Sequence, residues 1–338
     1  MIDFMEITID CKHQNVGNIL RNIDVSSGET RDYRKEGKVK NKYHNSLIVK
    51  SNDNGQRIKI KGNFVKYLQG HNIFGSNDLV GISYDVVKVI LEQLDIPITD
   101  SELTNIKNGY FSVHMVDIAW NYRQDAELIP NIIDEVGTLW RVRGKDVSNY
   151  SNKTVYLNQH SNQFAFKLYN KKLELAYRSL PINLPERERL LKYTVGLLRA
   201  ELRLHSKALR ELRLNVGQDW SVDKVKEMIE LALKQAEFSG SIYRRLIPDN
   251  VMQLKLKLRQ AYMLWEDGHD LAKLYDSQVL RRLRNSFAEI GVDISNPPPA
   301  SEHQEVNIAS CFSDENKLNF PKWARTKGLI HIPKKLKK

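Results

Sequence analysis

The chain has 338 residues, of which 41% are hydrophobic, and a formal net charge of +11. This apolar content is enough to build a core, and the basic excess favours a polyanionic partner, nucleic acid before an acidic membrane. The two cysteines, Cys11 and Cys311, are too far apart in sequence for a CxxC zinc site and argue against a disulfide-stapled secreted domain. The sequence has no signal-peptide pattern and no apolar stretch long enough to span a bilayer, so we expect a cytoplasmic protein without membrane contact.

The first half of the chain predicts a mixture of strands and helices. Alternating apolar residues at 5–9 indicate an opening strand, and the polar segment 21–45 predicts a long irregular region. Residues 47–60 carry a hairpin signal around a turn that ends in Asn-Gly. Ser83 is expected to cap a helix, and residues 111–120 predict a strand that is apolar on both faces and therefore central in its sheet.

A second hairpin is predicted at residues 154–169, with a polar turn at 158–162. In its second strand three apolar residues alternate with Lys167 and Tyr169, so the two sets face opposite sides of the sheet. The pattern turns helical immediately after Tyr169. The hairpin therefore places a tyrosine beside a lysine at the end of a strand, away from the apolar face.

From about residue 185 the pattern becomes mostly helical, and the arginine-rich run at 199–213 is expected to lie on helices. Residues 223–237 predict a clean amphipathic helix. Residues 270–290 predict two helices with a short break, which is compatible with either a helix-turn-helix or a plain helical hairpin.

These patterns predict an α+β fold with three parts. Residues 1–240 are expected to form an antiparallel sheet packed with helices, which carries any catalytic site. Residues 241–295 predict a helical region, and residues 296–338, which begin with Asn-Pro-Pro-Pro and end in lysines, predict a linker and a basic tail.

Tyr169 is the most informative candidate for chemistry. A phenol that attacks phosphorus must lose its proton, and the phosphate charge must be neutralised, which Lys167, Lys171 or a metal ion can do. The alternative is a tyrosine that only packs at the edge of the sheet against a lysine stem. Composition and spacing leave both possibilities open.

Four blocks of the sequence, in order, resemble the replication initiators of filamentous phages, the gene II protein-like rolling-circle endonucleases of inoviruses. Residues 66–75 resemble the family stretch K-x-L-Q-G-H-N-h-F-G, and residues 115–119 look like its R-I-D-A strand, with a methionine in place of the arginine. Residues 169–174 match Y-x-K-x-x-E, and residues 196–203 match G-L-h-R-x-E-x-R. The resemblance covers roughly residues 60–215.

This resemblance implies the sheet of a rolling-circle, HUH-like nickase and gives Tyr169 the role of nucleophile. The implied enzyme nicks one strand of a double-stranded phage origin, becomes joined to the 5′-phosphate, and later closes the displaced single strand into a circle. A host helicase and polymerase are implied partners, and no small-molecule cofactor is expected. Transesterification conserves the energy of the phosphodiester bond, so the implied reaction requires no ATP. The sequence accordingly has no phosphate-binding loop of the Gly-x-x-x-x-Gly-Lys type.

A divalent ion, Mg²⁺ or Mn²⁺, is expected to polarise the scissile phosphate. The candidate ligands are Asp117, His71 and Glu201. Each has a structural alternative: Asp117 as the partner of an arginine, His71 as a turn residue bonded to backbone, and Glu201 as a surface carboxylate among arginines. The sequence has no His-hydrophobic-His pair of the kind that many rolling-circle nickases use as ligands.

Two groups of basic and polar residues are candidates for DNA contacts. The alternative for the first group is a solvated helix face, and the alternative for the second is a plain helical hairpin packed on the catalytic part. The first group is Lys167, Arg199, Arg203 and Lys207; the second, on the last predicted helix, is Gln278, Arg281, Arg282 and Arg284. Two other functions remain open. One is a DNA-binding regulator without catalysis, and the other is a metal-independent tyrosine recombinase, although Tyr169 lies mid-chain rather than near the C-terminus.

Overall fold

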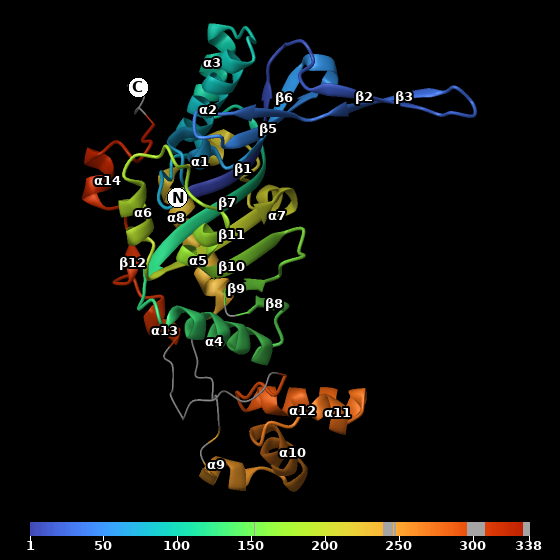
Figure 1. The fold of residues 1–338 in the computed structure, drawn as a ribbon, viewed down its shortest axis with the longest axis vertical. Helices are drawn as coiled ribbons and strands as arrows, with labels where there is room; N and C mark the ends of the chain where they lie inside the picture. The colour runs from blue at the N-terminus through green and yellow to red at the C-terminus, as the bar shows by residue number, and fades with distance from the viewer. Residues whose placement is uncertain (152, 239–245, 247, 296–307, 334–338) are drawn as a thin grey trace.

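The computed structural model describes residues 1–151, 153–238, 246, 248–295 and 308–333. Its centre is an antiparallel ten-stranded sheet in the order β4-β5-β6-β1-β7-β11-β10-β9-β8, with β12 beside β7 (Figure 1). The strands are β1 (Ile2–Asp10), β4 (Gly37–Lys40), β5 (Ser46–Asn52), β6 (Arg57–Gly62), β7 (Ser112–Arg123), β8 (Val147–Tyr150), β9 (Thr154–Leu157), β10 (Phe164–Asn170), β11 (Leu197–His205) and β12 (Lys317–Leu318). The predicted α+β class is confirmed.

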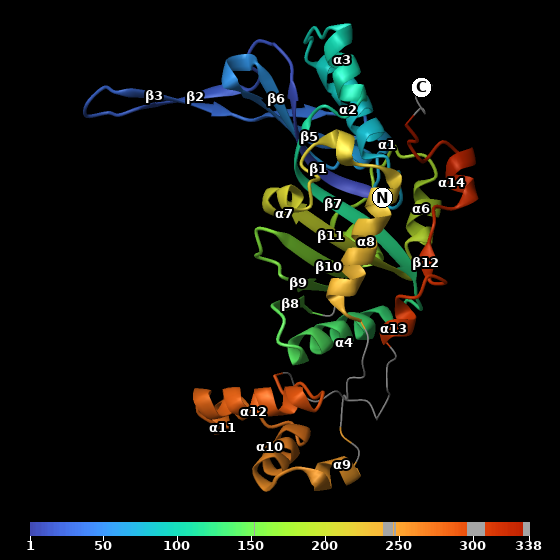
Figure 2. The ribbon, with the colours of Figure 1, turned by 180° about the vertical axis from the view of Figure 1, so that it is seen from behind.

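Helices pack on one face of this sheet and leave part of the other face open. Figure 2, which views the molecule from behind, shows α8 (Val222–Ala236) in front of the strands and α4 (Ile129–Val142) below it. The indole N–H of Trp140 in α4 donates to the carbonyl of Ala236 at 2.6 Å, and the Trp140 ring meets Phe166 of β10 edge-on. The sheet therefore buries its apolar face, and its polar side chains gather on the opposite face.

The central strand β11 differs from the helix predicted for this run. Its apolar residues (Leu198, Ala200, Leu202 and Leu204) are buried and alternate with Arg199, Glu201 and Arg203. This period of two is the pattern of a strand, and it places the three charged side chains together on the polar face. The helix prediction was wrong because flanking helical patterns and arginine-rich composition outweighed the alternation.

Most of the other predicted elements are confirmed. The hairpins appear as β5–β6 and β9–β10, and β7 is central as expected, between β1 and β11. Two predictions were wrong. The predicted irregular segment 21–45 contains the ribbon of β2 (Asn18–Ile23) and β3 (Thr30–Lys35), which projects from the body in Figure 1, and then β4. Helix α2 (Leu79–Gln93) is capped by Asp78, whose carboxylate accepts from the N–H of Gly81, and not by Ser83.

Short helices complete the first part of the chain and support the loops around the sheet. They are α1 (Phe64–Gln69), α3 (Asp100–Lys107), α5 (Lys171–Tyr177), α6 (Arg187–Tyr193) and α7 (Ser206–Glu211). Within the described residues, no helix combines the length and the apolarity that crossing a bilayer requires.

The helical region has an apolar core of its own, built around Tyr262, Trp265 and Phe287. Its helices are α9 (Pro248–Gln253), α10 (Leu256–Glu266), α11 (Leu271–Leu274) and α12 (Ser277–Glu289). An ion pair of 2.7 Å between Arg141 of α4 and Asp293 links this unit to the sheet domain. The predicted boundary near residue 240 and the Pro-rich linker lie outside the described residues.

The last described segment, residues 308–333, returns to the sheet domain instead of forming the predicted linker and tail. It contains α13 (Ile308–Cys311), β12, which pairs with the end of β7, and α14 (Lys322–Thr326). The backbone N–H of His331 donates to the side-chain carbonyl of Gln69 at 2.8 Å, and its ring lies 2.6 Å from the Asp85 carboxylate. We call residues 308–333 the C-terminal strap; the terminal lysines beyond it lie outside the described residues.

The strap should contribute measurably to stability. Leu329 is 3% exposed in an apolar cluster with Phe74 and Leu190, so Leu329→Ala should lower the free energy of unfolding by about 2–5 kcal/mol through lost burial and a residual cavity. Ile332, 45% exposed on the same strap, provides the control, and Ile332→Ala should stay within about 0.5 kcal/mol. Urea denaturation measures both, and equal effects would contradict the structural role of the strap.

Candidate active site

An open groove of about 940 Å³ lies over the polar face of the sheet, where β1, β7, β11, β10 and β9 run side by side. Strand register determines which side chains share it. Lys167 pairs with Glu201, Tyr169 pairs with Arg199, and Arg203 pairs with Asp117, so all of these residues point to the same face. The structure therefore brings the predicted nucleophile and two predicted metal ligands to one face.

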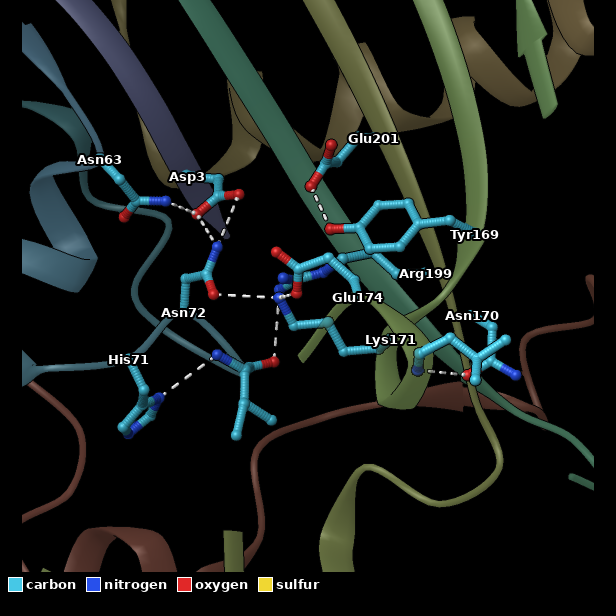
Figure 3. A network of polar contacts seen from close by, with 12 residues as sticks. Asp3, Asn63, His71, Asn72, Tyr169, Asn170, Lys171, Glu174, Arg199 and Glu201 are labelled. Carbon is cyan, nitrogen blue, oxygen red and sulfur yellow. Dashed lines mark hydrogen bonds and ion pairs between the residues drawn. The ribbon is translucent and has the colours of Figure 1, made fainter. Parts of the chain in front are cut away.

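Tyr169 lies at the floor of this groove and is 3% exposed. Its hydroxyl donates to Glu201 Oε1 at 2.6 Å (Figure 3). Burial, with the Glu201 carboxylate second, raises the pKa of Tyr169 well above its usual range, while Arg199 opposes the shift. The phenol is therefore neutral in this arrangement, and its proton already points at a carboxylate.

Three cations surround this phenol–carboxylate pair. Lys167 Nζ lies 3.3 Å from Glu201 Oε2 and 4.0 Å from the centre of the Tyr169 ring. Lys171 is fully buried at the start of α5, where its Nζ donates to Glu174 Oε2 at 2.8 Å and to Asn72 Oδ1 at 3.0 Å. Burial and then Arg199 lower the pKa of Lys171 to about 8.

The third cation, Arg199, is 0% exposed, so it does not lie where a DNA phosphate can reach it, contrary to its predicted role. Its Nη2 donates to the carbonyl of Ile73 at 3.3 Å, and its Nε and Nη1 are buried without a hydrogen-bond partner. A buried guanidinium in this state is costly unless acidic neighbours balance its charge. Burial by itself would raise the pKa of Glu201, but Lys167 and Arg199 outweigh it and lower that pKa to about 2.

The turn after α1 explains the Gln-Gly-His-Asn block. Gly70 has φ of 87°, and a Cβ there would clash with Leu184 and Tyr43, so the turn requires glycine. The turn presents the Asn72 side chain to two partners: its amide N–H donates to both Asp3 oxygens at 3.1 and 3.2 Å, and its carbonyl accepts from Lys171. Asn72 thus links the first strand to the helix that follows Tyr169 (Figure 3).

His71 points away from the groove floor. Its Nε2 lies 2.8 Å from the carbonyl of Leu329, which can only accept, and the N–H of Ile73 donates to its Nδ1 at 3.3 Å. Both ring nitrogens therefore have protein partners, and burial lowers the His71 pKa to about 4. This geometry corresponds to the alternative of a turn histidine, and it joins the turn to the C-terminal strap.

The predicted metal ligands Asp117, His71 and Glu201 do not come together. In the described part of the chain, no three His, Cys, Asp or Glu side chains are grouped closely enough to hold a metal ion. Asp117 is held by Arg203, whose Nε and Nη2 lie 2.8 and 2.6 Å from its oxygens, and Glu201 is held by Tyr169 and Lys167. As arranged here, the carboxylates are neutralised by protein cations and do not fit a metal ion.

Asp117 nevertheless differs from an ordinary ion-paired acid. It is 5% exposed, and burial raises its pKa to about 6 although Arg203 opposes the shift. The Arg203 side chain is 45% exposed and reaches the groove. An anion that attracts Arg203 would therefore leave Asp117 buried and unpaired.

The other predicted DNA contacts lie on exposed surfaces away from Tyr169. Lys207 is exposed on α7. The predicted reader residues (Gln278, Arg281, Arg282 and Arg284) are exposed on α12, which buries Leu280, Leu283 and Phe287 against the core of the helical unit. Helix α12 thus has one apolar face and one basic face, and the preceding helix α11 has only four residues.

Sequence reasoning missed three residues of the site: Asp3, Asn72 and Glu174. Asp3 is 5% exposed on β1, and burial raises its pKa, with Arg199 opposing. An acid inside the apolar run of the first strand is a signal that could have identified it. Asn72 and Glu174 belong to two of the family-like blocks, but their roles depend on contacts that spacing does not reveal.

Comparisons with known proteins place the chain in a family. The family model for the N-terminal region of the phage replication-associated protein, the gene II protein, matches residues 1–223. The replication-associated protein of the same type from Enterobacteria phage I2-2 is 26% identical over 344 residues, which cover 95% of this chain and 98% of that protein. The relative is therefore similar along nearly its whole length, including the helical unit.

The buried state of His71 should make stability depend on pH. The folded-state pKa of His71, about 4, lies below its ordinary value of 6.5, so between these pH values the unfolded chain binds more protons at this residue. This contribution to the free energy of unfolding is present above pH 6.5 and falls by on the order of 3 kcal/mol toward pH 4. The stability advantage of the wild type over His71→Gln, measured by urea denaturation, should therefore shrink between pH 7 and pH 4.5.

His160 provides a control because its side chain is exposed. His160→Gln should change the free energy of unfolding by less than about 0.5 kcal/mol at either pH. A difference between wild type and His71→Gln that stays constant with pH would show that His71 is not buried in its neutral form.

Proposed function

We propose that this chain, which belongs to the gene II family of phage replication-associated proteins, serves phage DNA replication as a tyrosine nickase that cuts one strand of a double-stranded origin. The observation that carries the proposal is the hydrogen bond from the Tyr169 hydroxyl to Glu201 at the floor of an open groove. A tyrosine that only packs at a sheet edge would not need a buried carboxylate and three buried or half-buried cations around its hydroxyl.

The chemistry proposed for Tyr169 is a transesterification. Its phenolic oxygen attacks the scissile phosphorus, a bond forms between them, and the bond from phosphorus to the 3′-oxygen breaks. The phenolic proton passes toward Glu201, and the departing 3′-oxygen takes up one proton, so the net change is the exchange of one phosphate ester for another. After a second cut, the 3′-hydroxyl at the other end of the displaced strand would attack the phosphorus of the tyrosine–phosphate bond; that bond breaks, the phenolic oxygen takes up the proton, and the strand closes into a circle.

Lys167, Lys171 and Arg199 supply the electrostatic part of this mechanism. Lys167 is closest to the phenol ring and borders the groove, so it can contact a non-bridging phosphate oxygen. Lys171 and Arg199 are fully buried, and their positive charge would favour the anionic form of the phenol and the negative charge of the transition state. Lys171 is therefore a positioning residue in this proposal.

Binding of the origin duplex is assigned to the exposed basic surfaces. The basic face of α12 and Lys207 of α7 are accessible, and contacts of this kind supply affinity that weakens with salt. A host helicase and polymerase that continue synthesis from the nick would be the next partners.

A requirement for Mg²⁺ or Mn²⁺ remains a prediction of the family resemblance. Of the three candidate ligands, Asp117 and Glu201 line the groove, so they would face a phosphate bound there. Before either could bind the ion, Asp117 would have to give up its ion pair with Arg203, and Glu201 its ion pair with Lys167. The roles proposed for Tyr169, Lys167, Lys171 and Arg199 do not depend on such an ion.

The competing function is a DNA-binding regulator without catalysis. The low exposure of Tyr169, 3%, favours it, because a nucleophile must reach phosphorus. Direct tests of the phenol separate the two functions.

Tyr169→Phe keeps the ring and removes the nucleophile. It should reduce nicking of a supercoiled plasmid that carries the phage origin by about 10³-fold or more, while origin binding in a gel-shift assay stays within about twofold. Unchanged nicking would exclude Tyr169 as the nucleophile. Incubation of the wild type with origin DNA, followed by peptide mapping, should yield a nucleotide adduct on residue 169.

Tyr110→Phe is the matched control, since Tyr110 is 54% exposed and does not line the groove. It should nick like the wild type. Loss of nicking in both variants would mean that the assay reports a general loss of structure, which circular dichroism would detect.

Metal dependence can be tested with the same plasmid. If a divalent ion polarises the phosphate, EDTA should abolish nicking and Mg²⁺ or Mn²⁺ should restore it, while binding persists. Asp117→Asn should then raise the Mg²⁺ concentration needed for half-maximal nicking. Nicking that is insensitive to EDTA would instead favour a metal-independent tyrosine transesterase, as in tyrosine recombinases.

A further inference from the structure

A row of aromatic and basic side chains leads along the groove from the edge of the sheet to Tyr169. Tyr150 of β8 and Tyr156 of β9 meet edge-on, with ring centres 5.8 Å apart. Lys167 comes next, with its Nζ 5.6 Å from the centre of the Tyr156 ring and 4.0 Å from that of Tyr169. All four side chains line the same groove.

A fourth tyrosine lines the groove near solvent. Tyr177, at the end of α5, is 76% exposed, and Lys153 Nζ lies 3.3 Å from its hydroxyl and 5.7 Å from its ring centre. Tyr150 is 50% exposed. Neither ring contributes much to the core, so the burial of apolar surface does not explain why large aromatic residues stand here.

The charges along the part of the groove that lies nearer to solvent than Tyr169 favour an anionic ligand. Glu201 and Asp117 are already paired with Lys167 and Arg203. Further lysine and arginine side chains line the groove nearer to solvent: Lys38, Lys61, Lys66, Lys153 and Arg178. The groove thus combines exposed aromatic faces with a surplus of cations, the two features with which proteins hold single-stranded nucleic acid.

We propose that this groove binds the scissile strand as unpaired nucleotides, with bases stacked on Tyr150 and Tyr177 and backbone phosphates beside Lys153 and Lys167. Both faces of a base are covered by its neighbours in a duplex, so stacking on these rings requires that the strand be locally melted. The identity of the strand rests on the proposed function; the binding itself does not require nicking. On this basis Tyr150 and Tyr177 are positioning residues that hold the strand over Tyr169.

The test uses full-length protein carrying Tyr169→Phe, so that no covalent product forms. Its affinity for a single-stranded origin oligonucleotide is measured by fluorescence anisotropy, and 2-aminopurine at successive positions reports stacking by quenching. Tyr150→Ala and Tyr177→Ala should each weaken single-strand binding about 5- to 150-fold and remove quenching at one position, because stacking on one ring contributes about 1–3 kcal/mol. Phenylalanine at the same positions should restore both signals.

Matched variants separate stacking from charge and from folding. Tyr110→Ala removes an equally exposed tyrosine outside the groove and should change neither signal. Lys153→Ala should weaken binding and flatten its salt dependence, whereas the tyrosine variants should keep the wild-type salt slope. Affinity for fully paired origin DNA should fall much less in the tyrosine variants than affinity for the single strand.

Two results would overturn the inference. One is that Tyr150→Ala and Tyr177→Ala keep the affinity and the quenching of the wild type. The other is that these variants lose as much affinity for fully paired origin DNA as for the single strand. Its failure is distinguishable from that of the proposed function. If Tyr169→Phe still nicks but the stacking signals behave as expected, only the nicking assignment fails. If Tyr169→Phe abolishes nicking and the groove tyrosines have no effect, only the stacking site fails.

Discussion

The hydrogen bond between Tyr169 and Glu201 imposes a charge balance that much of the surrounding structure satisfies. A carboxylate buried beside a phenol is unfavourable unless cations stand close by, and Lys167 and Arg199 provide them. Arg199, fully buried, in turn requires negative charge, which Asp3 and Glu201 supply. Removing any one member would leave another charged group buried without compensation, so the polar face behaves as one unit rather than as a set of independent contacts.

This unit is assembled from parts of the chain that are far apart in sequence. Asp3 comes from the first strand, and Asn72 of the Gly70 turn joins it to Lys171. His71 fixes this turn to the C-terminal strap, because its Nε2–H donates to the carbonyl of Leu329. The strap thus reaches the site through this turn and through the pairing of β12 with β7, the strand that carries Asp117.

The sequence predicted the position of Tyr169 well because a hairpin with alternating residues determines which face each side chain takes. It failed for β11, since an alternation of only nine residues between helical segments competes with the high helix propensity of arginine and leucine. The strap was missed because β12 has two residues and owes its conformation to pairing with β7. His71 and Asn72 are neighbours that point to different places, and only the backbone path of the turn determines which one reaches the site.

In the proposed reaction, the resting charges also bear on how a phenol as deeply buried as that of Tyr169 would become a nucleophile. Glu201 is a poor proton acceptor while Lys167 and Arg199 hold its pKa near 2. A phosphodiester entering the groove brings negative charge that competes for Lys167, the cation nearest to the groove. Once Lys167 turns to the phosphate, the pKa of Glu201 rises, and the carboxylate becomes a better acceptor for the phenolic proton. The substrate would thereby activate its own nucleophile, and a neutral phenol in the empty groove is the state that such a mechanism requires.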